Sequence, residues 1–243
     1  MIKGIYTSAS GMIPRARKQE LIANNISNVE TVGFKKDDTF TRELSRAERK
    51  TMAKKSDWEK PLGEESYVDY SEGIFNRTGN PLDLALEGDG FFTLQADDGT
   101  TYLTRAGTFE VNSDGQITYP GGLFLTASGS RIDTNGGTVN VNENGQVEVD
   151  GSTVATITPV TVDDLSKLEK VGRSLFAVPE GTQLIPVEQT TIRQGYLEAS
   201  NVDVVQQMVD MIITFRAYEA NAKAVQSQDS SLDNLFRRVA GDG

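Results

Sequence analysis

Cysteine and histidine are both absent from this sequence of 243 residues. Without a thiol the chain can form no disulfide, no thiolate metal site and no cysteine nucleophile. Without an imidazole it has neither a Ser-His triad nor a histidine general base. These two absences remove several of the common catalytic arrangements.

Positive charge is scarce, since 24 Lys and Arg face 35 Asp and Glu and the net charge is −11. A nucleic acid partner needs a basic face, so we expect none. The segment 35–60 is the exception, because it holds nine Lys or Arg against six Asp or Glu. We interpret it as a solvated connector, with contact to an acidic neighbouring surface as the alternative.

Long hydrophobic runs are missing as well. No run of about eighteen apolar residues occurs, so we expect no membrane insertion. Residues 1–20 contain no continuous apolar segment of the kind that a cleaved signal peptide needs. The chain is therefore expected either to stay in the cytoplasm or to leave by a route without a cleaved signal.

Residues 204–239 carry a stripe of apolar residues spaced four and three apart, with only Asp229 breaking it. A repeat of about 3.5 residues makes a narrow stripe on a helix, and a narrow stripe favours pairing with another helix. The stripe consists of Val204, Met208, Met211, Phe215, Tyr218, Ala222, Val225, Asp229, Leu232, Phe236 and Val239.

Residues 1–29 predict a second amphipathic helix, with Ile5, Met12 and Ile26 on one face and Ile22 widening it. Three asparagines, Asn24, Asn25 and Asn28, follow near its end. Polar side chains there either fix the register of helix packing or cap the helix, and both interpretations stay open. We expect the two terminal stripes to pack on each other and on neighbouring subunits.

Residues 76–195 predict many short antiparallel strands. Asn-Gly and Asp-Gly pairs recur between short apolar or alternating runs, and such pairs favour tight hairpin turns because both residues tolerate positive φ. Residues 107–117 also resemble residues 137–147, with Gly, Thr, Val, Asn, Gly and Gln at matching places. We interpret the two copies as similar hairpins in one sheet system.

Acidic residues in this region offer two weak chemical candidates. The turn that begins at Asn112 resembles a calcium loop, but its twelfth residue is Leu123 where such a loop needs Glu. Asp83, Glu87 and Asp89 could in principle supply the carboxylate pair of a glycosidase, but Trp58 is the only tryptophan and no aromatic sugar platform accompanies them. We therefore expect no metal and no cofactor.

Three groups of motifs together resemble the bacterial flagellar rod and hook proteins. The first is Ile22-Ala-Asn-Asn-Ile-Ser-Asn28 followed by Thr31-Val-Gly-Phe-Lys35. The second is Leu82-Asp-Leu-Ala-Leu-Glu-Gly-Asp-Gly-Phe-Phe92 with Tyr102-Leu-Thr-Arg-Ala-Gly-Thr-Phe109. The third runs from Gly195-Tyr-Leu-Glu-Ala-Ser-Asn-Val202 through Met208-Val-Asp-Met-Ile212 to Arg216-Ala-Tyr-Glu-Ala-Asn-Ala-Lys-Ala224.

The resemblance implies an α+β fold, with a discontinuous coiled-coil-like helical domain from both termini and a central β-rich domain. The expected parts are residues 1–33 and 199–243 as a rod-core domain, 34–75 as a linker or hairpin, and 76–198 as an outer β-domain. Within the family the proximal-rod type resembles the chain most, because distal-rod proteins carry a longer insertion after the Gly-Phe-Lys motif.

The resemblance also implies the partners. They are copies of the chain, other flagellar rod proteins and the flagellar type III export apparatus, and the location is the periplasm-spanning rod of the basal body. A secreted cell-wall carbohydrate-active enzyme and a coiled-coil-anchored adhesin or phage-tail subunit are the competing classes. The expected subunit-packing residues are Ile5, Met12, Ile22, Asn24, Asn25, Ile26, Asn28, Val204, Met208, Met211, Phe215, Tyr218, Ala222, Val225 and Leu232.

Overall fold

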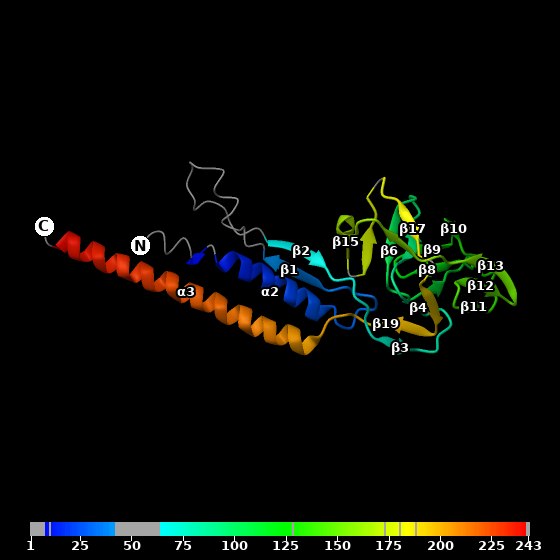
Figure 1. The fold of residues 1–243 in the computed structure, drawn as a ribbon, viewed down its shortest axis with the longest axis horizontal. Coiled ribbons are helices and arrows are strands. Elements are labelled where there is room, and N and C mark those ends of the chain that lie inside the picture. The colour runs from blue at the N-terminus through cyan, green and yellow to red at the C-terminus, as the bar shows by residue number, and fades with distance from the viewer. Residues whose placement is uncertain are drawn as a thin grey trace. The chain divides into compact units, whose positions relative to one another are not determined.

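The computed structural model describes residues 8–9, 11–41, 64–127, 129–172, 174–179, 181–187 and 189–241. Ile5 and residues 42–63 of the expected connector lie outside these ranges, as do the side chains of Phe236 and Val239. The chain forms two compact units (Figure 1). Unit 1 combines Met1–Ser27, Asp37–Asp69 and Asp203–Gly243, and unit 2 combines Asn28–Lys36 and Tyr70–Val202.

Unit 1 contains two helices and a two-stranded sheet. Helix α2 (Met12–Ser27) lies antiparallel beside helix α3 (Val204–Gly241), and α2 also packs against strand β1 (Figure 1). Strand β1 (Asp37–Thr41) pairs antiparallel with β2 (Glu64–Val68), with Asp37 opposite Val68. The expected linker or hairpin therefore begins and ends as a paired ribbon.

Helix α3 begins where Asp203 caps it. The Asp203 Oδ1 atom accepts a hydrogen bond of 3.1 Å from the Gln206 amide, and the Asp203 carbonyl accepts one of 2.9 Å from the Gln207 amide. A capping carboxylate satisfies amide groups that have no partner within the helix. The helix then runs for 38 residues, which at 1.5 Å per residue is about 57 Å.

The less exposed face of α3 consists of two sets of positions, and each set recurs every seven residues. One set of positions is polar and the other is mostly apolar, and all are half-buried except the buried Thr214. The polar set is Gln207, Thr214, Asn221 and Gln228, and the other set is Met211, Tyr218, Val225 and Leu232. In the expected stripe, the set that holds Met211 and Tyr218 is therefore half-buried. In the other set Met208 and Phe215 are exposed, because Gln207 and Thr214, each one position earlier, lie on the less exposed face instead.

Unit 2 is built from short strands, as the turn pattern predicted. Its strands are β3 (Phe75–Arg77), β4 (Leu84–Glu87), β5 (Phe92–Gln95), β6 (Thr101–Thr104), β7 (Glu110–Val111), β8 (Ile117–Tyr119), β9 (Leu123–Ala127), β10 (Ser130–Arg131), β11 (Val139–Val141), β12 (Gln146–Val149), β13 (Ser152–Thr156), β14 (Val160–Val162), β15 (Glu169–Val171), β16 (Leu175–Ala177), β17 (Leu184–Pro186), β18 (Thr191–Gln194) and β19 (Tyr196–Glu198). A 3₁₀ turn, η2 (Leu165–Lys167), precedes β15.

The strands form one larger sheet and several small ones, and every pairing among the described strands is antiparallel. The larger sheet has the order β15-β16-β6-β5-β9-β8-β7, with β10 beside β9. The expectation of a helix near each end and a central region of short antiparallel strands is confirmed. Strand β18 pairs with β4 and strand β19 with β3, so residues 191–198 lie beside residues 75–87.

The core of unit 2 joins the larger sheet to the sheet β11-β12-β13. Leu94 and Leu125 from the first and Val147 from the second are fully buried in one apolar cluster. Phe92 and Phe109 pack edge to face in it, with their ring centres 5.3 Å apart. Each strand is too short to bury much area alone, so this shared cluster is what makes the strands one unit.

The two similar segments do form similar hairpins. In the first, the Asn112 Oδ1 atom accepts hydrogen bonds from the amides of Asp114 and Gln116. In the second, the Asn142 Oδ1 atom accepts from the amides of Asn144 and Gln146. The expectation of a single sheet system is wrong, since the first hairpin belongs to the larger sheet and the second to the three-stranded sheet.

Candidate subunit-packing surface and buried charge cluster

The first turns of α3 expose a row of apolar side chains. The exposed fractions are 73% for Val205, 52% for Met208, 45% for Val209, 55% for Ile212, 58% for Ile213 and 47% for Phe215. At about 100° per residue, Val205, Val209 and Ile212 lie on the side of the helix opposite Thr214, and Met208, Ile213 and Phe215 flank that side. An uncovered row of this kind marks a surface for a partner. We call these six residues the apolar face of α3.

The row is confined to the first half of the helix. Continuing along the same side, the chain presents Arg216, Glu219 and Lys223, which are exposed and charged. The sequence stripe included Met208 and Phe215 but not Val205, Val209, Ile212 or Ile213. The sequence does contain a sign of these four residues. Over the first turns of α3 apolar residues occur on two sides of the helix, and a single stripe accounts for only one of them.

The expected packing residues fall in different environments. Ile22, Asn25 and Asn28 are buried, whereas Asn24, Met208 and Phe215 are exposed. Ile5 lies outside the described residues. The others are half-buried, and they are Met12, Ile26, Val204, Met211, Tyr218, Ala222, Val225 and Leu232.

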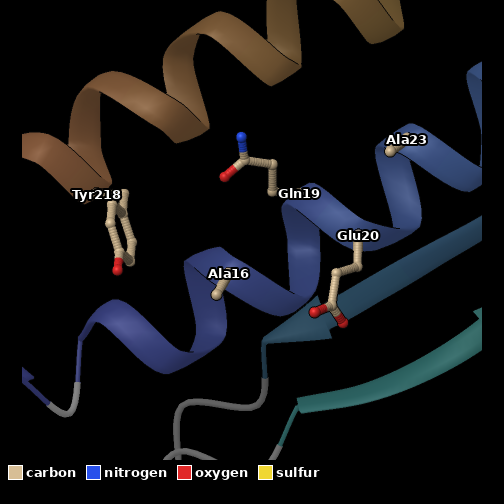
Figure 2. Close-up of a pocket in the computed structure, with 5 residues that line it drawn as sticks. All are labelled: Ala16, Gln19, Glu20, Ala23 and Tyr218. Atoms are coloured by element: carbon tan, nitrogen blue, oxygen red, sulfur yellow. The ribbon is translucent and has the colours of Figure 1, made fainter.

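The two helices leave a recess of about 430 Å³ between them. Figure 2 shows Tyr218 of α3 and Gln19 of α2 directed into the space between the helices, beside the small side chains of Ala16 and Ala23. Glu20 also lines the recess but extends toward the side of β1 (Figure 2). The two alanines contribute little side-chain volume at this contact, which leaves room for the recess.

Asn25 fastens the end of α2 to its neighbours in unit 1. Its Nδ2 atom donates to the Asp37 carbonyl at 2.8 Å and to the Gln207 Oε1 atom at 3.2 Å. Its Oδ1 atom accepts from the Asp37 amide at 3.0 Å, and the residue is only 2% exposed. Asn25 therefore fixes the register of α2 against β1 and α3, while the Asn28 Oδ1 atom accepts from the Thr31 hydroxyl in the turn that follows.

A buried charge cluster lies in unit 2. The Lys35 Nζ atom is 2.5 Å from the Glu198 Oε1 atom, and both side chains are fully buried. The second carboxylate oxygen, Glu198 Oε2, lies 3.4 Å from the Arg105 Nη1 atom, and the Arg105 side chain is 3% exposed. We call Lys35, Arg105 and Glu198 the charge cluster.

Burial sets the electrostatics of this cluster. It lowers the pKa of Lys35, because removal from water disfavours the ammonium form, while the carboxylate of Glu198 acts in the opposite direction. Charged side chains are rarely buried unless they are paired. The sequence motifs contained Lys35, Arg105 and Glu198, but no local pattern distinguished them from exposed charges.

The backbone approaches the cluster closely. A Cβ atom on Gly33, which has φ +65°, would lie 2.3 Å from the Ala106 amide nitrogen. A Cβ on Gly73 would lie 2.0 Å from the Ala199 carbonyl oxygen. Lys170 closes one side, with its Nζ atom 4.0 Å from the centre of the Phe34 ring and 2.8 Å from the Lys35 carbonyl oxygen. Only glycine fits at these two contacts, so the packing specifies both positions.

Two of the three carboxylates considered for glycoside hydrolysis have structural partners. The Asp83 Oδ1 atom accepts from Asn80, and the Glu87 Oε2 atom lies 2.9 Å from the Arg193 Nε atom. The Asp89 backbone carbonyl accepts from the Thr190 hydroxyl. In the described part of the chain, no group of three or more Asp and Glu could hold a metal ion. None of the described helices is long and apolar enough to cross a membrane.

Comparison with family models places three matches along the chain. Residues 5–35 match the flagella basal body rod protein model, and residues 85–149 match the flagellar hook protein FlgE/F/G D1 domain. Residues 193–238 match the flagellar basal body rod FlgEFG protein C-terminal model. Each matched region supplies one member of the charge cluster: Lys35 from the first, Arg105 from the second and Glu198 from the third.

Several curated proteins are similar over nearly the whole chain. The flagellar basal-body rod protein FlgF of Caulobacter vibrioides is 34% identical over 93% of this chain and 94% of its own length. The flagellar basal-body rod protein FlgG of Borreliella burgdorferi is 30% identical over 98% of this chain and 100% of its own. The flagellar hook-basal body complex protein FlhO of Bacillus subtilis is 30% identical over 98% and 99%.

Proposed function

The chain belongs to the flagellar basal-body rod and hook protein family and is a structural rod subunit, and we propose that it is a FlgF-like subunit of the proximal rod. The comparison with FlgG of Borreliella burgdorferi extends over 275 aligned positions, more than the 243 residues of this chain. That comparison therefore needs gaps in this chain, whereas the one with FlgF of Caulobacter vibrioides extends over 230 positions. The shorter connector after Lys35 also favours the FlgF type.

We propose that the subunit polymerises through its terminal helices, with residues 1–33 and 199–243 as the rod-core domain. The apolar face of α3 carries this proposal, because it is long, uncovered and opposite the side that meets α2. A second copy or another rod subunit would cover it with a helix of its own in a coiled-coil-like contact. Contacts that repeat head to tail without closing into a ring produce a helical filament, and such a filament transmits torque through packing.

The proposed export route, location and lack of a catalytic role follow from the assignment of the chain as a rod subunit. The chain reaches the basal body through the flagellar type III export apparatus, without a cleaved signal, and spans the periplasm as part of the rod. It has no catalytic role, since every part of the chain that matches a family model matches a rod or hook component.

Phe215→Lys is expected to abolish swimming while leaving the monomer folded. Phe215 is 47% exposed, so a lysine at this position can keep its ammonium group in water in the monomer, but it places a charge within an apolar subunit contact. The measurement is swimming in soft agar by the parent bacterium with the variant gene, together with circular dichroism of the purified protein.

Gln226→Lys is the matched control, because position 226 is exposed on the same side of α3 beyond the apolar face. This variant should swim normally. Normal swimming by Phe215→Lys would remove the apolar face of α3 from the assembly contact.

Deletion of the gene distinguishes the proximal from the distal position. Loss of a proximal subunit leaves no base on which the distal rod and the hook can assemble, so basal bodies isolated from the deletion strain should lack both. Electron microscopy of those basal bodies makes the measurement. Basal bodies that keep a short rod and lack only its outer part would identify the chain as a distal-rod subunit of the FlgG type.

A further inference from the structure

The chain passes between the two units at four places, and these passages occur after Ser27, Lys36, Asp69 and Val202. Inside unit 2 they belong to three segments, 28–36, 70–73 and 198–202. Every covalent connection between unit 2 and unit 1 therefore runs through these three segments.

The charge cluster joins the three segments to one another. From the first segment, the Lys35 Nζ atom donates to the Ser71 carbonyl of the second at 2.6 Å and to Glu198 of the third. The Gly73 amide of the second segment donates to the Glu198 Oε1 atom at 3.0 Å. The Gly33 amide donates to the Glu198 carbonyl at 2.8 Å. Each segment thus meets both of the others at Lys35 and Glu198.

A neutral side chain repeats this connection beside the cluster. The Asn201 Oδ1 atom accepts from the Lys36 amide at 2.8 Å, and its Nδ2 atom donates to the Ser71 carbonyl at 3.2 Å. Tyr70 packs on the rings of Phe91 and Phe176, with ring centres 5.7 Å and 5.5 Å apart. The second segment is therefore held on its apolar side as well.

Arg105 connects the joined segments to the β-core. Its Nη2 atom donates to the Gly88 carbonyl at 2.7 Å and its Nη1 atom to the Leu86 carbonyl at 3.3 Å, next to Glu198. The Arg105 Nε atom is buried with no hydrogen-bond partner among the described residues.

We propose that Lys35, Arg105 and Glu198 form a charge lock that fastens the three connecting segments of unit 2 in one register. Apolar side chains could hold the segments as firmly, but they would also tolerate a slipped arrangement. A buried ion does not, since any slip separates it from its counter-charge inside the protein. The lock therefore gives one arrangement of the segments and disfavours its neighbours.

The lock has a mechanical consequence that rests on the proposed function. In a rod subunit, load enters unit 2 through the connecting segments. Because the segments are joined at the charge cluster and at Asn201, load on any one of them is shared by the other two and passed through Arg105 to strands β4 and β6.

Hydrogen exchange on the purified full-length chain tests the lock without any reference to the rod. Glu198→Gln keeps the shape of the side chain and removes its charge. We expect exchange at least ten-fold faster at the amides of Gly33, Lys36 and Gly73, with unchanged exchange at the core amides of Leu94 and Leu125. Arg193→Gln is the control, since it removes a charge from the half-exposed pair with Glu87 in the same unit and should alter none of these amides.

Two results would overturn the proposal: no change at the segment amides, or an equal increase in the segments and the core. If Glu198→Gln does not fold, Lys35→Met decides, because it leaves Glu198 paired with Arg105 and should release the same amides. Failure of both variants to fold would mean that the cluster holds the whole core, which also overturns the proposal. Faster exchange with normal swimming would keep the lock and contradict only its role under load.

Discussion

Gly107→Ala is expected to prevent unit 2 from folding. A Cβ atom at this position would lie 1.5 Å from the Leu84 carbonyl oxygen and 2.6 Å from the Leu84 carbonyl carbon. These are backbone atoms at the start of a strand whose first three residues are buried, and the Leu84 amide donates to the Gly107 carbonyl at 2.9 Å. The segments around Gly107 and Leu84 cannot move apart without breaking this hydrogen bond and the neighbouring pairing of Asp83 with Thr108.

The expected cost of Gly107→Ala exceeds about 4–5 kcal/mol, the range in which single substitutions are exceptional, and total stabilities are only about 5–15 kcal/mol. The measurement is near-ultraviolet circular dichroism, which reports the packed Phe and Tyr rings of unit 2. A cooperative unfolding transition with a free energy of unfolding within about 2 kcal/mol of the wild-type value would show that the two segments can move apart to admit the methyl group.

Gly99→Ala is the matched control for backbone strain. Gly99 has φ +87° but has nothing within 4 Å of an added Cβ. Alanine there should cost only about 1–2 kcal/mol, the penalty for a left-handed backbone. The comparison separates the close approach at Gly107 from the conformational preference of glycine.

Glu198→Leu is expected to cost about 3–5 kcal/mol of unfolding free energy, the usual effect of removing one partner from a buried ion pair. It leaves Lys35 and Arg105 buried as two positive charges without their shared carboxylate. The double variant Lys35→Met with Glu198→Leu removes one of those charges and replaces the Lys–Glu pair by apolar volume. It should recover part of the loss, because a buried pair exchanged for apolar groups is often neutral, while Arg105 still lacks its carboxylate.

Urea unfolding followed by near-ultraviolet circular dichroism measures this cycle, and the difference from additivity is the coupling between Lys35 and Glu198. The half-exposed pair of Arg193 and Glu87 provides the reference, since Glu87→Leu should cost less than about 1 kcal/mol. Additive losses at Lys35 and Glu198 would mean that the two charges do not stabilise each other.

The turns of unit 2 were predictable because their signal is local. Asn135 and Asp150 have φ of +46° and +49°, and each precedes a glycine that also has positive φ. A dipeptide that tolerates this backbone reveals the turn without any knowledge of the rest of the fold. The sheet to which each hairpin belongs depends instead on distant strands, which is why the two similar hairpins were wrongly assigned to one sheet system.

The side of α3 that meets α2 was only half predictable. The repeat through Met211 and Tyr218 was found because it is apolar, whereas Gln207 and Thr214 were passed over for the more apolar Met208 and Phe215. Neighbouring residues on a helix point about 100° apart. When the contact includes polar side chains, hydrophobicity alone does not show which of two neighbouring residues faces the other helix. The hydrogen bond between Asn25 and Gln207 joins residues 182 apart and leaves no sign in either local sequence.

The order of the residues along the chain determines when the charge cluster and the contact between α2 and α3 can form during synthesis. Glu198 leaves the ribosome 163 residues after Lys35, which at about 5–20 residues per second is a delay of roughly 8–33 s. Until then Lys35 and Arg105 have no common counter-ion, and α2 has no α3 to pack against. The nascent chain therefore makes neither of these contacts until residues 198–241 have been synthesised, and that one stretch supplies the missing partner of both.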